Sequence, residues 1–121
     1  MSDEELLARA VAVAERAYAP YSRFHVGCAL LARDGRVIEG VNVENAAYPL
    51  GVCAERAALS RAVAEGYRPG DIAAAAITAS PCGGCRQWLL EFRVERVVFR
   101  NGGRVATMTP AELLPESFEL P

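Results

Sequence analysis

The segment Pro81-Cys82-Gly83-Gly84-Cys85 constrains this chain most, because it breaks a short apolar run before a predicted helix. Two cysteines three positions apart at such a turn can direct both sulfurs at one metal ion, and turn N–H groups can donate to the sulfurs. We expect the two glycines to let the backbone fold around the metal. Zinc ribbons, redox dithiols and iron–sulfur sites all use such a pair, so the pair alone leaves the chemistry open.

A second segment, Cys53-Ala54-Glu55-Arg56, narrows these alternatives. Cys53 opens a predicted helix, whose positive N-terminal dipole favours a thiolate. A zinc ribbon needs a second cysteine pair, which is absent; an iron–sulfur cluster needs a fourth thiolate, for which only Cys28 is left. A redox dithiol would not explain the second segment. Cys53, Cys82 and Cys85 instead form a three-cysteine zinc site whose fourth position is left for water, as in catalytic zinc centres.

Glu55 and Arg56 add reactive groups beside these ligands. Glu55 lies two residues after Cys53 in the first helical turn, so it can reach water at the metal without being a ligand. A ligand two residues before a glutamate, followed by Pro-Cys-x-x-Cys, is the signature of zinc nucleobase deaminases. Arg56 is a candidate to neutralise thiolate charge. Taken singly, Cys53 is explained as a buried cysteine, Glu55 as a helix-face carboxylate and Arg56 as a surface arginine. Together, at this spacing, they favour the catalytic interpretation.

Hydrophobic patterning predicts one α/β domain over residues 1–121. Helices are expected at about 3–18, 53–65 and 86–92, with a short one capped by Thr109, and strands at 26–32, 36–43, 72–79, 96–100 and 104–108. Ser2 and Glu5 form a capping box for the first helix. This order predicts a three-layer α-β-α architecture, with a mixed five-stranded sheet and helices on both faces.

Composition excludes several functional classes. The net charge is −2, with acidic and basic residues interspersed, which argues against a nucleic-acid partner. No stretch approaches the roughly 20 apolar residues of a membrane span, and the N-terminus lacks the pattern of a signal peptide. We therefore expect a cytoplasmic protein with reduced cysteines. Alanine makes up much of the apolar content, so we expect tight helix packing or subunit contacts to supply additional burial.

The chain resembles the short-chain, homotetrameric cytidine deaminases over nearly its whole length. The matching segments are Ala19-Pro20-Tyr21-Ser22-Arg23-Phe24, Asn42-Val43-Glu44-Asn45-Ala46-Ala47-Tyr48, Cys53-Ala54-Glu55-Arg56, Pro81-Cys82-Gly83-Gly84-Cys85-Arg86-Gln87 and Leu113-Leu114-Pro115-Glu116-Ser117-Phe118. The resemblance implies the cytidine deaminase fold and zinc-dependent hydrolytic deamination of cytidine and deoxycytidine to uridine and deoxyuridine, with release of ammonia, in pyrimidine salvage.

The same resemblance implies roles for further residues. Asn42 and Glu44 bind the ribose 3′-hydroxyl, and Phe24 packs on the substrate. The Ala54 N–H contacts the base carbonyl, and the Ser80 carbonyl accepts from the leaving amine. Tyr48 and Phe118 complete a neighbouring subunit's site in a homo-oligomer, a tetramer by resemblance.

The residues give independent support for a sugar site at Asn42 and Glu44. Alternation in a strand places both side chains on one face, where they offer a donor and an acceptor to a diol. A polar loop segment is the structural alternative.

Two departures from the family pattern bear on the interpretation. His25 stands where the family commonly has proline, and the segment between Glu55 and Cys82 is short. Two other functions stay open: a deaminase of another amino-heterocycle or of an RNA base, and a structural zinc module with His25 as its fourth ligand. The Asn42 and Glu44 pair and the acidic charge favour a free nucleoside.

Overall fold

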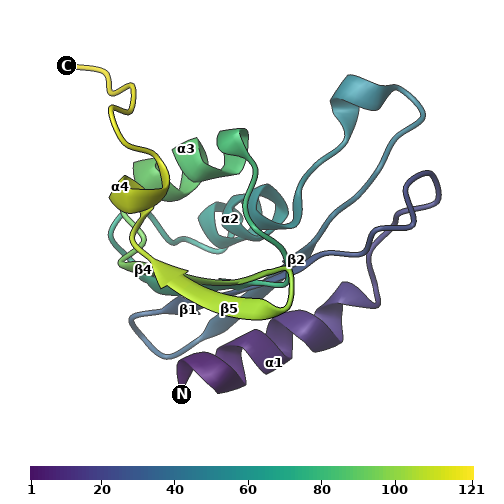
Figure 1. Ribbon diagram of the computed structural model, residues 1–121. Coiled ribbons are helices and arrows are strands. Elements are labelled where there is room, and N and C mark those ends of the chain that lie inside the picture. Colours follow the sequence, from purple (N-terminus) through teal and green to yellow (C-terminus); the bar gives the residue numbers. More distant parts are fainter.

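The computed structural model describes residues 1–121 as a five-stranded sheet covered by helices on both faces (Figure 1). The elements follow the order α1 (Asp3–Ala14), β1 (Gly27–Ala32), β2 (Val37–Val41), the 3₁₀ turn η1 (Tyr48–Leu50), α2 (Ala54–Ala64), β3 (Ile72–Ile77), α3 (Gly83–Glu91), β4 (Arg96–Asn101), β5 (Arg104–Met108) and α4 (Pro110–Leu113). No helix is long and apolar enough to cross a membrane.

The strands lie in the order β2-β1-β3-β4-β5. β3 and β4 are parallel and are connected through α3, whereas the other neighbouring pairs are antiparallel. α1 covers one face of the sheet, and α2 and α3 lie over the other (Figure 1). The predicted three-layer α-β-α fold with a mixed sheet is confirmed.

Alternation along the strands divides the core into two apolar layers. Cys28 and Leu30 of β1 face the larger layer, which includes Leu59 of α2 and Leu89 of α3. Ala29, between them in β1, faces the smaller layer against α1. Cys28 is therefore a core residue, as the apolar sequence around it predicts.

Close helix packing requires glycine at two strand positions. A Cβ on Gly27 would lie 2.0 Å from the carbonyl oxygen of Ala10 in α1, and one on Gly40 would lie 2.4 Å from the backbone nitrogen of Ala58 in α2. Both clashes involve backbone, which side-chain rotation cannot relieve. Close packing of helices is thus present at these two strands, as one of the two expected sources of additional burial, and Gly40 lets α2 lie directly on β2.

Two helix boundaries differ from the sequence prediction by three or four residues, and β2 ends at Val41 rather than at residue 43, so Asn42 follows the strand. α1 ends at Ala14 rather than at residue 18, because the backbone of Tyr18 pairs with the extended segment that follows β2: its N–H donates to Asn42 O, and its carbonyl accepts from the Glu44 N–H. α3 begins at Gly83 rather than Arg86, because Cys82 occupies its N-cap. The capping boxes at Ser2 and Thr109 are confirmed.

Candidate metal and active site

The topology brings the first turns of α2 and α3 together. β2 and β3 are each antiparallel to β1, so they run in the same direction and their carboxyl ends lie at the same edge of the sheet. α2 is the next α-helix after β2, and α3 follows β3, so both helices begin near that edge. Cys53 is the N-cap of α2 and Cys82 is the N-cap of α3.

The three predicted cysteine ligands converge at this point. The sulfurs of Cys53, Cys82 and Cys85 all lie within 4.8 Å of one another, and those of Cys53 and Cys82 are 3.9 Å apart. A tetrahedral ion with zinc–sulfur bonds of about 2.3 Å holds its sulfurs about 3.8 Å apart. The donor set and its spacing therefore fit zinc, and the predicted convergence is confirmed.

The surroundings of the sulfurs also suit a metal. Burial raises the pKa of the Cys85 thiol, and the Glu55 carboxylate raises it further. Burial acts the same way on Cys82, but hydrogen bonds from the Cys85 N–H and from neighbouring thiols outweigh it and lower the Cys82 pKa. A bound cation would offset the cost of a buried Cys85 thiolate, which couples metal binding to deprotonation.

The alternative ligands lie elsewhere. His25 is exposed and is not part of the group of sulfurs, and Cys28 is fully buried in β1. Neither the structural module closed by His25 nor a fourth thiolate from Cys28 is supported by this arrangement.

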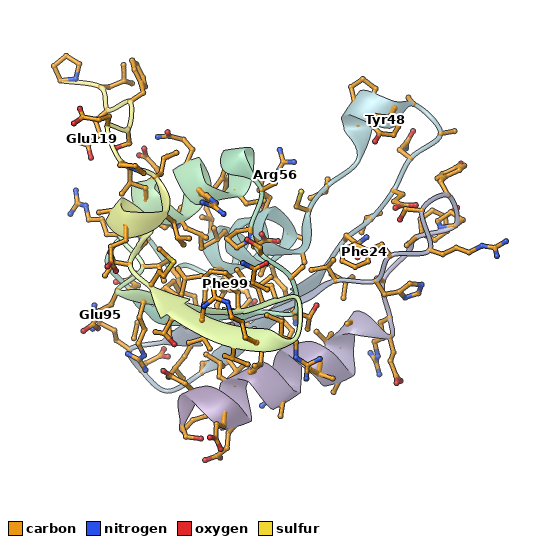
Figure 2. The ribbon with its side chains drawn as sticks, in the orientation of Figure 1. Phe24, Tyr48, Arg56, Glu95, Phe99 and Glu119 are labelled. Atoms are coloured by element: carbon orange, nitrogen blue, oxygen red, sulfur yellow. The ribbon has the colours of Figure 1, made fainter.

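Glu55 and Arg56 flank the sulfurs from the first turn of α2. Glu55 is only 4% exposed, and this burial raises the pKa of its carboxyl group. Arg56 Nη2 donates to Cys53 Sγ at 3.4 Å, while its Nε is buried without a hydrogen-bond partner. In Figure 2, Arg56 lies above the sheet, with Phe24 to one side of it. A guanidinium here places positive charge against the sulfurs.

A cavity of about 270 Å³ opens in front of the sulfurs. It is bounded by residues from four segments of the chain, namely Ser22, Phe24, Val26, Asn42, Glu44, Cys53, Ala54, Glu55, Ala79, Ser80 and Cys82. Its size suits a small ligand. Six of the predicted catalytic and substrate-binding residues therefore share one cavity with two of the cysteines: Phe24, Asn42, Glu44, Ala54, Glu55 and Ser80.

Asn42 and Glu44 line this cavity and also hold residues 21–26 in its wall. Asn42 Oδ1 accepts from the Val26 N–H at 2.8 Å, and its Nδ2 donates to Phe24 O at 2.9 Å. Glu44 accepts from the Ser22 hydroxyl and from the N–H groups of Tyr21 and Ser22. These hydrogen bonds, led by that of the Ser22 hydroxyl, lower the pKa of Glu44. An amide has two donors and two acceptor sites, so Asn42 keeps one of each.

Tyr48 and Phe118 lie outside this cavity. Tyr48, on η1, is 93% exposed and borders an adjoining hollow on the far side of Asn42 and Glu44. Phe118 is 71% exposed on the C-terminal tail, and its carbonyl accepts from Gln87 Nε2 at 3.0 Å. Figure 2 shows Tyr48 projecting on one side of the molecule and Glu119, in the tail, on the other. Neither aromatic ring is enclosed within its own chain.

Comparison with known proteins agrees with this geometry. The sequence profile of the cytidine and deoxycytidylate deaminase zinc-binding region matches residues 1–101.

The chain belongs to this family.

Individual family members align with nearly the whole chain. A cytidine deaminase of Halalkalibacterium halodurans is 44% identical, over 98% of this chain and 95% of its own. The crystal structure of cytidine deaminase from Burkholderia pseudomallei is 46% identical, covers 98% of this chain and 100% of its own, and superposes with a TM-score of 0.92. That of Mycobacterium tuberculosis is 38% identical over 99% of each chain, with a TM-score of 0.84. The resemblance noted in the sequence is thus confirmed, and the match to a zinc-binding region agrees with the convergence of the three cysteines.

Two features of this deaminase site were missed or misinterpreted from the sequence. Ser22, whose hydroxyl holds Glu44, belongs to a matched segment, but nothing in its local pattern indicated that role. Gly83 and Gly84 were expected to let the backbone fold around the metal. Neither has a positive φ, and a Cβ on either would meet nothing within 4 Å. The backbone of α3 therefore does not require glycine at these positions.

The convergence of the sulfurs leads to a prediction on zinc content. Cys53→Ala removes one of three ligands, so zinc in the purified, dialysed protein falls from one per chain to well below half, as measured by elemental analysis. Cys28→Ala is the matched control and retains one zinc, because Cys28 lies in the core. Full zinc content in Cys53→Ala, or metal loss in a folded Cys28→Ala, would contradict this ligand assignment.

Proposed function

We propose that this protein is a zinc-dependent cytidine deaminase that hydrolyses cytidine and deoxycytidine to uridine and deoxyuridine with release of ammonia. One observation carries the proposal: a single cavity of about 270 Å³ is lined by Glu55, by two of the three cysteines, and by Asn42 and Glu44. Its lining supports a site that combines reaction chemistry at the cysteine centre with recognition of a sugar by Asn42 and Glu44.

Glu55 is the proposed proton carrier. Cys53, Cys82 and Cys85 would hold a zinc ion, which would supply Lewis acidity to activate the attacking water. Glu55 takes a proton from the attacking water and delivers it to N3 of the base, and water oxygen adds to C4. The carboxyl group then carries the second proton to the amino group, which leaves as ammonia. One carboxylate serves both transfers because the protons move in succession.

The remaining residues orient the nucleoside. Asn42, with one free donor and one free acceptor, and Glu44 bind the ribose 3′-hydroxyl. Phe24 packs on the substrate. The N–H of Ala54, in the first turn of α2, has no helical partner and donates to the base carbonyl. The Ser80 carbonyl accepts from the leaving amine, and Arg56 neutralises thiolate charge beside the metal.

Two competing functions have weaker support. An RNA-base deaminase needs a surface that tracks a phosphate backbone, whereas this chain has a net charge of −2. A purely structural zinc module would not need a buried carboxylate facing a cavity at the metal. A centre of three thiols also needs reduced cysteines, so we place the enzyme in the cytoplasm.

We further propose a homo-oligomer, most simply a tetramer, with composite active sites. Tyr48 and Phe118 each expose an apolar ring that their own chain does not cover. A second apolar surface supports subunit contact: Trp88 stacks on Phe92 at 6.2 Å beside a hollow of about 510 Å³ between α2 and α3. Packing neighbours against these surfaces would bury them and exclude water from the nucleoside.

The proposed role of Glu55 as proton carrier leads to a prediction on activity. Glu55→Gln keeps the shape and the metal ligands but cannot accept a proton, so kcat for cytidine falls by on the order of 10³–10⁴-fold. Loss of cytosine absorbance on mixing with cytidine measures the rate, and zinc content is checked in parallel.

Glu95→Gln is the matched control, because Glu95 is an exposed carboxylate paired with Arg33 and remote from the cysteines. Its rate should equal that of the unaltered protein. Turnover by Glu55→Gln within tenfold of the unaltered protein would rule out Glu55 as the proton carrier. An unaltered, zinc-loaded protein that leaves cytidine intact would refute the proposed function itself.

The proposed composite site leads to a prediction on mixed oligomers. A Phe118→Ala chain and a Glu55→Gln chain, each poorly active alone, are mixed under conditions that exchange subunits. If Phe118 acts on a neighbour, some mixed oligomers combine an intact Glu55 with an intact Phe118 from the adjacent chain. Cytidine turnover should then exceed the average of the two parents.

A chain carrying both substitutions, mixed with Glu55→Gln, is the control and gains nothing, since no intact Glu55 is present. Activity of the test mixture that only averages its parents, or a fully active monomer, would show that Phe118 serves its own chain or no site at all.

A further inference from the structure

Arg86 connects the cysteine centre to the C-terminal part of the fold. It follows Cys85 in α3 and is half-buried. Its Nε donates to Pro81 O at 2.9 Å and its Nη1 donates to Leu113 O at 2.9 Å. Its Nη2 lies 3.3 Å from the Ser80 hydroxyl oxygen. One planar guanidinium thus joins the loop before Cys82 to the end of α4.

These two carbonyls depend on Arg86. Leu113 is the last residue of α4, where the helix has no N–H of its own to offer. Pro81 precedes the N-cap of α3, so its carbonyl lies outside the hydrogen-bond ladder of that helix. α4 packs beside α3 (Figure 1), which brings Leu113 within reach of the same side chain. The guanidinium group presents its N–H donors in a fixed planar fork, so one side chain can donate to carbonyls on two separate segments.

The loop that Arg86 holds carries part of the site without belonging to a helix or strand. Ser80, Pro81 and Cys82 lie between β3 and α3 and form no helix or strand. The ring of Pro81 fixes its φ angle, and the contact to Pro81 O restrains the peptide that leads into Cys82. The direction of the Ser80 carbonyl and the position of the Cys82 sulfur are therefore set together.

We propose that Arg86 is a positioning residue, which sets the Ser80 carbonyl and the Cys82 sulfur by bridging the loop to the C-terminal carbonyl of α4. The inference rests on the proposed function, because the Ser80 carbonyl is assigned there to the leaving amine. Arg86 acts through hydrogen-bond geometry, in contrast to Arg56, which donates directly to a ligand sulfur.

Two substitutions distinguish an effect of the hydrogen-bond geometry of Arg86 from an effect of its positive charge. Arg86→Lys keeps the positive charge but offers one compact ammonium on a flexible stem, which cannot reproduce the fork. Arg86→Gln removes both the positive charge and the fork of donors. If geometry decides, the two variants behave alike; if charge decides, lysine restores the properties of the unaltered protein.

The test measures zinc transfer to a colorimetric chelator, together with kcat and KM for cytidine. Both Arg86 variants should release zinc at least tenfold faster than the unaltered protein and lose about tenfold in kcat. Arg68→Gln is the matched control: Arg68 also donates to two carbonyls, of Val63 and Tyr67, but lies away from the cysteines. Gln87→Ala removes only the contact to Phe118 O and should leave zinc release unchanged.

Each other outcome overturns the inference. Zinc release by the Arg86 variants at the rate of Arg68→Gln would show that the bridge does not position the ligands, and full rescue by lysine would show that charge alone acts. Equally fast release by Gln87→Ala would assign the effect to the C-terminal tail. If Arg86→Gln fails to fold, Arg86→Lys decides alone. An unaltered protein inactive on cytidine would refute the proposed function, while the zinc-release comparison would still test the bridge.

Discussion

The common direction of β2 and β3 is the constraint on which the site depends. It places the first turns of α2 and α3 side by side, so that Cys53, Cys82 and Cys85 meet although 28 residues separate Cys53 from Cys82 in the sequence. It also directs two helix N-termini at sulfur atoms that carry negative charge when a metal is bound. Gly40 also contributes to the position of α2, because only a residue without a Cβ lets α2 lie this close to β2.

Part of the wall of the cavity is built by Asn42 and Glu44, the residues proposed to contact the sugar. Asn42 and Glu44 follow β2 and hold residues 21–26 by their hydrogen bonds, which places Phe24 beside the cavity. Substitutions at Asn42 or Glu44 will therefore alter the shape of the wall as well as the proposed contacts to a sugar. Ser22 shares in this arrangement through its hydroxyl group, and it bounds the same cavity.

The features that could be predicted from the sequence are those that depend on local residue patterns or on the spacing of residues along the chain. Apolar alternation and capping residues gave the strands, most helix positions and the layered sheet, and the cysteine spacing gave the ligand group. Features that depend on tertiary contacts were missed: α1 ends early because Tyr18 pairs with distant backbone, and the partners of Arg86 lie on segments that only folding brings together. The proposed roles of Tyr48 and Phe118 involve a second chain, and for these residues only the family resemblance offered a signal.

The central claim is that three cysteines hold one zinc and leave one position open to water. X-ray absorption spectroscopy at the zinc edge tests it most directly. We expect three sulfur neighbours at about 2.3 Å and one oxygen neighbour at about 2.0–2.2 Å, with one zinc per chain. Four sulfur neighbours, or an imidazole nitrogen from His25 in place of the oxygen, would show a closed structural site and contradict the account.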